Sequence, residues 1–316
     1  MHYESQSLIV TTREPFGKRV PIDLCDRIFR SLSPMFAHSV RMAVEGTSSS
    51  PGAQPSWLRR AGDVRVLGFD ESGPVTLLNV EAPMLGEAAE ELYSQNEFWP
   101  TKPSPDETAI HVFAKALEDV TRGNPESVLY DRHLLKRFSA FNRVFEKGVV
   151  SVGVPVAPGD EHFSARMDES SLRNARELSE RTPPPQQIRI TGKLDMIRHS
   201  TRSFALITDD GHEVRGVLET QDWTEEIKDF LGKRILVLGK AVFRPSGSLL
   251  RIDATGVEGG EGQSLLFAKL PRPRALRPEL VRTKASDRRG VPAFFGSWPG
   301  EESDEDFESL VREIRH

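Results

Sequence analysis

Two stretches of sequence decide the fold of this chain: IRITGKLDM at residues 188–196 and ILVLGKAVF at residues 235–243. In both stretches every second residue is apolar or glycine. A period of two is typical of a β-strand that has one face in a core and the other in water. We therefore expect both stretches to be strands of the same folded module.

Further strands and one short helix are expected between and after these stretches. Turn signals occur at 209–211 and 245–247, and Asp222 can cap a helix that ends at Gly232. The apolar positions of these elements are Phe204, Leu206, Val214, Leu218, Trp223, Ile227, Phe230, Leu231, Leu250, Ile252 and Ala254. The order strand, strand, strand, helix, strand, strand over residues 186–258 resembles that of an OB-type barrel with five strands.

The wet face of this barrel carries basic residues that could contact the phosphates of a nucleic acid bound across the second and third strands. They are Lys193, Arg198, Arg202, Arg215, Lys240, Arg244 and Arg251. The alternative is a solvated barrel face without a ligand. Two observations favour it: acidic residues of the same segment nearly cancel the basic ones, and Phe204 and Phe243 fall in the inward register, away from any base.

Residues 1–157 predict a mixed α/β domain. Apolar residues at mixed three and four spacing between Pro21 and Gly46 predict helical pieces that are interrupted at Pro34. The Ser- and Gly-containing stretch 46–55 predicts a flexible loop that is disordered or at the surface. Alternating apolar runs around a Gly-bearing turn predict a β-hairpin over residues 64–80.

Two more helices are expected later in this domain. Ser104, Pro105 and Glu107 form the signature of a helix N-terminus, and the apolar stripe that follows stops at Gly123. A second helix is expected from about residue 126 to Gly148. Each apolar stripe is interpreted as part of the core.

A linker is expected between this domain and the barrel. The polar stretch 158–179 predicts one exposed helix, and the three prolines at 183–185 predict a stiff extended spacer. The predicted fold class is α+β: an N-terminal α/β domain at 1–157, a helical and proline-rich linker at 158–185, an OB-fold-like barrel at 186–258, and a disordered basic linker with a partner-binding tail and a short C-terminal helix at 259–316.

Composition excludes several classes of protein. The 316 residues are 37% hydrophobic and 28% charged, with a formal net charge of −5 and a single cysteine, Cys25. No run approaches the roughly 20 apolar residues that cross a bilayer, and residues 1–10 lack the pattern of a secretion signal. One cysteine fits a reducing compartment, so the predicted location is the cytoplasm, without membrane contact.

No catalytic motif stands out in the chain. GxSxG, P-loop, GxGxxG and HExxH patterns are absent. The nearest acid and histidine groupings are Asp131 with His133, Glu161 with His162, and His212 with Glu213, and all three are expected to be surface pairs. We therefore predict no catalytic residues, no cofactor and no metal site, although an active site assembled from dispersed residues of the first domain is left open.

The C-terminal segment carries the strongest functional signal. Residues 269–290 are basic and proline-rich, residues 301–308 are acidic, and three large aromatic residues lie between them without apolar neighbours to bury them. Ser303 can cap a short helix with one apolar face. The residues expected to bind a partner are Phe294, Phe295, Trp298, Phe307, Leu310, Val311, Ile314, Arg312 and Arg315.

The stretch FGSWPGEESDEDF at residues 295–307, followed by a short apolar helix, resembles the C-terminal tail of bacterial antitoxins that are encoded just before PIN-domain ribonuclease toxins. The resemblance covers about the last 25 residues. It implies that the tail wraps the toxin and blocks its acidic, Mg²⁺-dependent active site, with Trp298 and Phe307 as anchors. It also implies that Leu310, Val311 and Ile314 fill a groove and that Arg312 or Arg315 approaches the toxin's carboxylates.

The rest of the chain departs from that family, because its antitoxins are typically short and dimerise through a DNA-binding N-terminal segment. Operator binding and dimerisation are therefore not carried over. The predicted function is an antitoxin-like component of a bacterial toxin–antitoxin pair, with a PIN-type ribonuclease as its protein partner. The alternative is an OB-fold protein that binds single-stranded nucleic acid and has no toxin partner.

Overall fold

The structure is a computed structural model that describes residues 1–50, 52–93, 103–156, 165–198, 201–218, 227–259 and 270–273. The chain divides into two compact units, Met1–Pro273 and Arg274–His316. Every described residue belongs to the first unit, and the proline stretch expected to mark a domain boundary falls inside it.

The first unit begins with a five-stranded sheet in the order β2-β3-β1-β4-β5. All neighbouring strands are antiparallel. Their bounds are β1 Tyr3–Thr12, β2 Arg65–Ser72, β3 Val75–Pro83, β4 Val149–Val154 and β5 Ala165–Met167. The predicted hairpin is confirmed as the β2–β3 pair. The central strand β1 lies in a segment for which no helix or strand was predicted.

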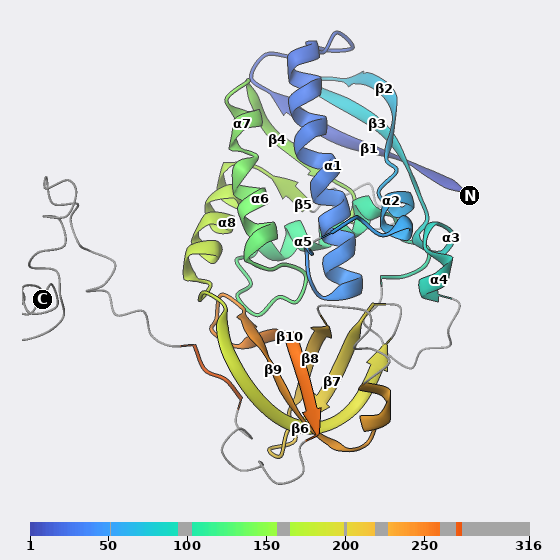
Figure 1. Ribbon diagram of the computed structural model, residues 1–316. Helices are drawn as coiled ribbons and strands as arrows, with labels where there is room; N and C mark the ends of the chain where they lie inside the picture. Colours follow the sequence, from blue (N-terminus) through green and yellow to red (C-terminus); the bar gives the residue numbers. More distant parts are fainter. Residues whose placement is uncertain are drawn as a thin grey trace, which may run out of the picture. The chain divides into compact units, whose positions relative to one another are not determined.

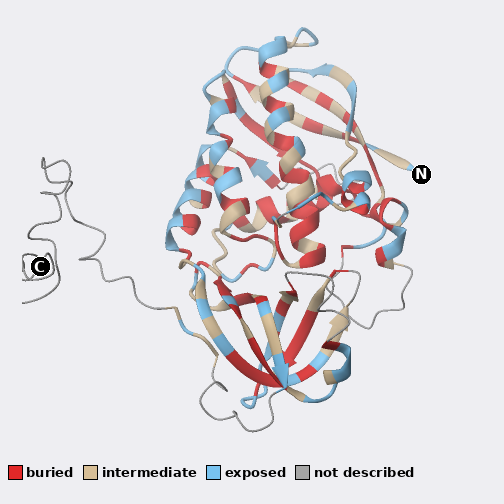
Figure 2. Cartoon of the chain, in the orientation of Figure 1, coloured by how far each residue is buried: buried red, intermediate tan, exposed pale blue. Residues whose placement is uncertain are grey.

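Helices cover one face of this sheet (Figure 1). The longest are α1 Ile22–Glu45, α5 Ala109–Thr121, α6 Arg132–Ala140 and α8 Glu169–Arg181. Shorter helices are α2 Ser56–Ala61, α3 Leu85–Ala88, α4 Glu90–Tyr93 and α7 Asn142–Phe145. The buried residues gather between helices and sheet and inside the barrel below them (Figure 2).

Helix α5 lies at the centre of the helical layer, because its residues are buried on nearly every side. The ring of Phe113 stacks on Phe138 of α6 with centroids 5.5 Å apart, and it meets Phe36 of α1 edge to face at 5.1 Å. Burial of large aromatic side chains contributes strongly to core stability. This aromatic cluster ties three helices together.

The prediction that the first helical segment is interrupted at Pro34 is wrong, since α1 runs unbroken through that residue. A proline removes one backbone hydrogen bond from a helix interior. Leu32, Met35 and Phe36 around it are all buried, and their burial outweighs that loss. The helix ends at Gly46, whose φ of 73° is the left-handed conformation that favours glycine.

Two predicted helix starts lie too early in the sequence. Ser104 and Glu107 form only a local turn, in which the Ser104 backbone N–H donates to the Glu107 carboxylate. Helix α5 begins after Thr108 and α6 after Asp131. In α6 the Asp131 carboxylate accepts the backbone N–H of Leu134, and this capping bond fixes the start.

The stretch expected to form one exposed helix contains the strand β5 as well as the helix α8. Its residues 158–164 lie outside the described part. Helix α8 buries Leu172, Ala175 and Leu178 in the same core as α5 and α6, so it is not an exposed helix.

The second part of the unit is a closed barrel of five strands in the order β10-β8-β7-β6-β9. The strands are β6 Gln186–Arg198, β7 Ser203–Ile207, β8 Glu213–Leu218, β9 Arg234–Phe243 and β10 Leu249–Gly259. The predicted strands are confirmed, and so is an α+β fold that contains a five-stranded barrel. Of the expected short helix, the turn η1 Lys228–Phe230 is described, whereas Asp222 and Trp223 lie outside the described residues.

The barrel closes because one long strand pairs on both sides and because two strands meet in parallel. Strand β6 pairs with β9 along its first part and with β7 along its second. Strands β10 and β8 complete the ring through a parallel pairing of Ile252 with Gly216. A closed ring leaves no unpaired strand edge.

The barrel has a separate apolar core, but two of its residues belong to the helical core instead. Val242 of β9 and Leu250 of β10 pack with the α/β residues. The two parts of the unit therefore share apolar contact in addition to the polar contacts described below.

Gly216 tests how tightly the barrel is packed. A Cβ at this position would lie 2.1 Å from the Cζ atom of Phe204, which is fully buried and cannot move away. We expect G216A to lower the free energy of unfolding by about 3 kcal/mol, the upper end of overpacking costs. In the control G256A the nearest atom is the end of the flexible Leu238 side chain, so the cost should stay below about 1 kcal/mol. Urea unfolding followed by circular dichroism measures both, and equal losses would contradict the packing argument.

Candidate ligand groove and its buried polar junction

A groove of about 810 Å³ lies where the barrel meets the helical part. Its helical wall is the C-terminal end of α1 with residues 128 and 129, and its barrel wall comes from β7, β8 and the connection between β9 and β10. Apolar side chains contributed by both walls are Met42, Val44, Val128, Leu129, Met196, Leu249 and Leu270. This volume is in the range of sites that hold small organic ligands or part of a larger one.

Four of the seven basic residues predicted to meet phosphates line this groove: Arg198, Arg215, Arg244 and Arg251. The other three are not among its lining residues. Lys193 and Lys240 are exposed elsewhere on the barrel, and Arg202 adopts a left-handed backbone conformation with a φ of 54°. The structure thus brings four of the predicted basic residues together in one groove, whereas Lys193 of β6 and Lys240 of β9 lie outside it.

Arg215 and Arg244 face different surroundings in the groove. Arg215 is exposed, and its Nε atom donates to the Glu213 carboxylate at 3.0 Å. Arg244 is half-buried, and its Nη1 atom donates to Ser248 Oγ at 3.1 Å and to the Leu249 carbonyl. Burial lowers the pKa of Arg244, Glu126 raises it, and the nearby Arg215 charge lowers it further. The two guanidinium groups therefore lie close enough to influence each other.

Arg251 has a different role, because it is buried and ion-paired. Its Nη1 atom lies 3.4 Å from Asp131 Oδ2, its Nε atom donates to Asp253 at 2.7 Å, and its Nη2 atom donates to Thr47 Oγ1 at 3.1 Å. Arg251 was predicted to contact phosphate, and the structure shows that carboxylates of the chain already compensate its charge. Arg251 instead joins the barrel to two segments of the helical part.

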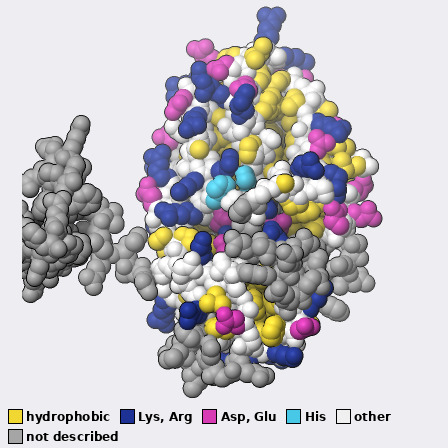
Figure 3. All heavy atoms as spheres, viewed as in Figure 1, with side chains coloured by type: hydrophobic (Ala, Val, Ile, Leu, Met, Phe, Trp, Pro, Cys, Tyr) yellow, Lys and Arg dark blue, Asp and Glu magenta, His cyan; other side chains and the backbone are white. Residues whose placement is uncertain are grey.

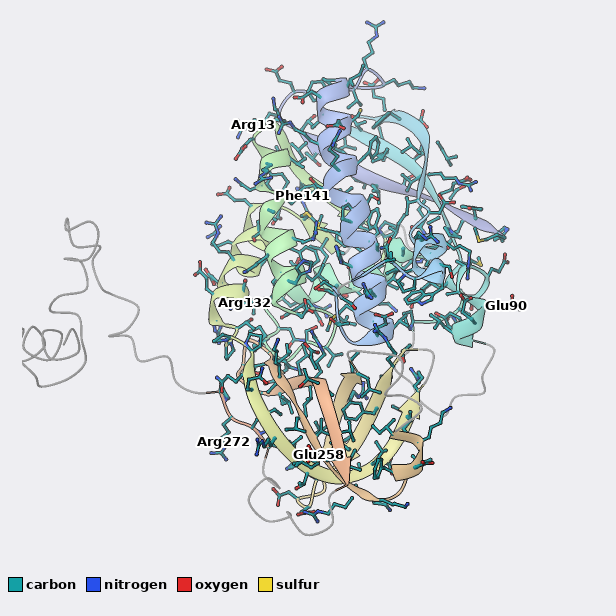
Figure 4. All side chains as sticks on the ribbon, viewed as in Figure 1. Arg13, Glu90, Arg132, Phe141, Glu258 and Arg272 are labelled. Carbon is teal, nitrogen blue, oxygen red and sulfur yellow. The ribbon has the colours of Figure 1, made fainter. Side chains whose placement is uncertain are left out.

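Asp131 is the centre of this junction. Its carboxylate accepts the Ser48 backbone N–H at 3.0 Å and the Ser48 hydroxyl at 2.6 Å, besides capping α6. Burial alone would raise the pKa of Asp131, but the Arg251 charge and the Ser48 bonds outweigh it and hold that pKa below its ordinary value. Figure 4 labels the next residue, Arg132, at the end of the helical layer that adjoins the barrel.

Two histidines extend the junction toward the surface. His38 contacts the Ser48 carbonyl through Nδ1, and His133 Nδ1 lies 3.1 Å from Ser48 Oγ. Their rings meet edge to face with centroids 5.1 Å apart. Burial lowers the pKa of both imidazoles, so neutral rings are favoured at pH 7. Figure 3 shows a histidine patch on this face, with Lys and Arg side chains around it.

This arrangement corrects one prediction and part of another. The stretch 46–55 was expected to be disordered or at the surface; Ser49 and residues 52–54 are exposed, whereas Ser48 is 0% exposed and binds Asp131. Asp131 and His133 were expected to form a surface pair, yet Asp131 is 5% exposed. The capping pattern at Asp131 was the sequence signal that could have identified it. The partners of Asp131, by contrast, come from segments 83 and 120 residues away.

The chemistry of the junction is that of a structural link. The Ser48 hydroxyl donates to Asp131, so His133 donates to Ser48 Oγ and does not act as its base. Within the part of the chain that the structure describes, no group of three or more His, Cys, Asp or Glu side chains could hold a metal ion. Of the other two predicted pairs, Glu161 and His162 are outside the described residues, and Glu213 next to His212 instead binds Arg215.

The predicted partner-binding residues of the tail all lie outside the described residues. None of the described helices is long and apolar enough to cross a bilayer. Comparisons of this chain with protein-family descriptions, with curated proteins and with solved structures gave no match.

We expect D131N to lower the free energy of unfolding by about 3–5 kcal/mol, because it removes the buried one of the two carboxylates that pair with Arg251 and weakens the cap of α6. Asp23, which forms exposed ion pairs with Arg27 and Lys147, provides the control, and D23N should lower the free energy of unfolding by less than about 1 kcal/mol. Urea unfolding at pH 7 measures both variants. A D131N midpoint equal to that of D23N would contradict the central role of Asp131.

The same residue predicts a pH dependence. The pKa of Asp131 is lower in the folded chain than its unfolded value of about 3.9. Its contribution to stability is therefore complete above the unfolded value and is lost as the pH falls through the folded value. The difference in stability between wild type and D131N should shrink below about pH 4, and a difference that stays constant down to pH 2 would contradict this assignment.

Proposed function

We propose that the folded unit binds a single strand of nucleic acid in the groove beside the barrel, and that the barrel is of the OB type. The strand order and the parallel closure of β8 with β10 match that type. In OB folds the face of the second and third strands, with the connections between strands 1 and 2 and between 4 and 5, binds oligonucleotides. Here these elements are β7, β8 and the β6–β7 and β9–β10 connections.

The observation that carries this proposal is the convergence of arginines on that face. Arg198 ends β6, Arg215 lies on β8 and Arg244 follows β9, and all three line the groove. Cationic side chains from separate segments, set in a concave and partly apolar surface, match a phosphate backbone and its attached bases. The formal charge of the whole chain is −5, so this local basic region is what distinguishes the groove.

The groove also limits the kind of recognition that we propose. Phe204 and Phe243 are buried inside the unit, in agreement with their predicted inward register, and are not available to stack on bases. Binding would then depend mainly on phosphate contacts and apolar surface. We expect weak sequence preference and a steep dependence on salt, because phosphate contacts release condensed counterions.

Fluorescence anisotropy with a labelled oligothymidine tests the proposal. We expect micromolar affinity at low salt, which falls linearly with the logarithm of the salt concentration. R215Q should weaken binding and reduce the magnitude of the salt slope by about 1. The control R189Q changes an exposed arginine on β6 that does not line the groove, and it should bind as the wild type does. An unchanged anisotropy at low salt would rule out strand binding.

A second candidate function is that of an antitoxin-like protein, which neutralises a PIN-type ribonuclease with its C-terminal segment. The observation that favours it is the sequence of residues 294–316, in which three large aromatic residues precede a stretch whose spacing predicts a capped amphipathic helix. A short amphipathic helix is marginal by itself and gains stability in the groove of a partner. Cytoplasmic location belongs to this proposal too.

Co-expression with the protein encoded next to this chain tests the antitoxin proposal. We expect W298A and F307A each to weaken the complex by about 2–4 kcal/mol, as truncation of buried interface aromatics commonly does. R312A should matter less unless Arg312 is desolvated against the toxin's carboxylates. If a chain ending at Gly290 copurifies and restores growth as well as the full chain, the antitoxin proposal is wrong.

A further inference from the structure

Arg244 holds a positive charge that makes no direct ion pair in the described part of the protein. Its Nε atom is buried and has no hydrogen-bond partner, and no described carboxylate lies within ion-pair distance of its guanidinium. Its known partners, the Ser248 hydroxyl and the Leu249 carbonyl, are neutral. A guanidinium removed from water in this way is unfavourable unless an anion pairs with it.

Two acidic groups near this part of the groove bind other donors directly. Glu126 raises the pKa of Arg244, and its carboxylate accepts the Ser248 hydroxyl at 2.8 Å, so it offsets part of the guanidinium charge without contacting it. Glu213 accepts Arg215 at 3.0 Å. Meanwhile Arg215 adds a second positive charge near Arg244. The site therefore has two guanidinium groups at the wall of the groove, and neither Glu126 nor Glu213 forms a direct ion pair with Arg244.

We propose that Arg244, together with Arg215 on the same groove wall, binds one phosphate group of the ligand. We call this position the phosphate seat. A guanidinium binds phosphate through N–H···O bonds, and Arg244 has Nη2 left for them, because Nη1 binds Ser248 and Leu249 and Nε is buried. The apolar lining next to this seat would contact the sugar or base attached to the phosphate. This inference rests on the proposed nucleic-acid function and specifies which residue fixes the position of the strand.

Arg244 and Arg251 are only seven positions apart in sequence but have opposite roles. Arg251 is paired with Asp131 and Asp253, and it holds the barrel in place. Arg244 has the same side chain but no carboxylate partner in the described part, so the ligand would supply its counter-charge. A structural arginine would be compensated as Arg251 is, which is why Arg244 and not Arg251 is assigned to the phosphate.

The test compares wild type with R244Q, R244K and the matched control R189Q in two assays. The first is thermal unfolding in inorganic phosphate against chloride at equal ionic strength. We expect phosphate to raise the midpoint of wild type and R189Q but not that of R244Q. The second is anisotropy with oligothymidine, in which R244Q should lose at least about tenfold in affinity and R244K should lose less, because it keeps the charge without the fork geometry.

Each outcome separates the seat from the proposed function. If R244Q binds the strand with wild-type affinity and wild-type salt slope, the seat is wrong while strand binding stands. If phosphate stabilises wild type but not R244Q and no strand binds, the seat stands for a small phosphate ester and strand binding fails. If phosphate shifts R244Q as much as wild type, the seat is overturned. Should R244Q fail to fold, the same comparisons apply to R244K, whose phosphate shift must then be smaller than that of R189Q.

Discussion

The buried contact between Asp131 and Arg251 is the interaction on which the described unit depends. One carboxylate starts helix α6, holds the segment after α1 through Ser48, and neutralises an arginine of the barrel. Both charged groups are almost completely buried, so neither can exchange its partner for water without a large cost. The donors around Asp131 offset the cost of burying its negative charge. Loss of either Asp131 or Arg251 would leave the other charge buried without this partner.

The groove exists because this junction fixes the barrel against the end of α1. Arg251 anchors the start of β10, and the preceding connection is held as well, since the Ser246 backbone N–H donates to the Pro125 carbonyl and Ser248 binds Glu126. Val242 and Leu250 add apolar contact to the helical core. Apolar packing supplies much of the stability of such a junction, and the polar bonds fix its register. Together they bring arginines of the barrel next to apolar residues of another segment.

The groove therefore combines two parts of the chain that would each be incomplete alone. The barrel contributes the arginines that line the groove, and the helical part contributes its second wall. A half-buried guanidinium without a direct ion pair lowers the stability of the fold, so the rest of the structure must offset that cost. Such destabilising groups are common at binding sites. The well-paired Arg251 and the poorly paired Arg244 illustrate how one loop and strand can serve stability and binding at once.

The sequence by itself determined the elements whose signals are local. The alternation around Gly192 and Gly239 gave the barrel strands, and the turn before Val75 gave the β2–β3 hairpin, because a strand with one buried face must repeat every second residue. The succession of strands along the barrel segment was also expected, whereas the pairing of β6 with β9 and of β8 with β10 came only with the tertiary structure. Helix starts were less secure: Ser104 carries a capping pattern as good as that of Thr108, and only packing selected the later one.

Only the tertiary structure decided which charged residues face a common groove and which are neutralised. Ser48 reads as part of a loop and Asp131 as one half of a surface pair, and nothing near either residue in sequence reveals that they share a buried hydrogen bond. Arg244 and Arg251 look equivalent in the alternating pattern, yet one meets two carboxylates and the other none in the described part. Local sequence fixes the conformation of a segment and the face on which a side chain lies. The partner across a junction depends on residues far apart in the chain, whose proximity arises only when the cores pack.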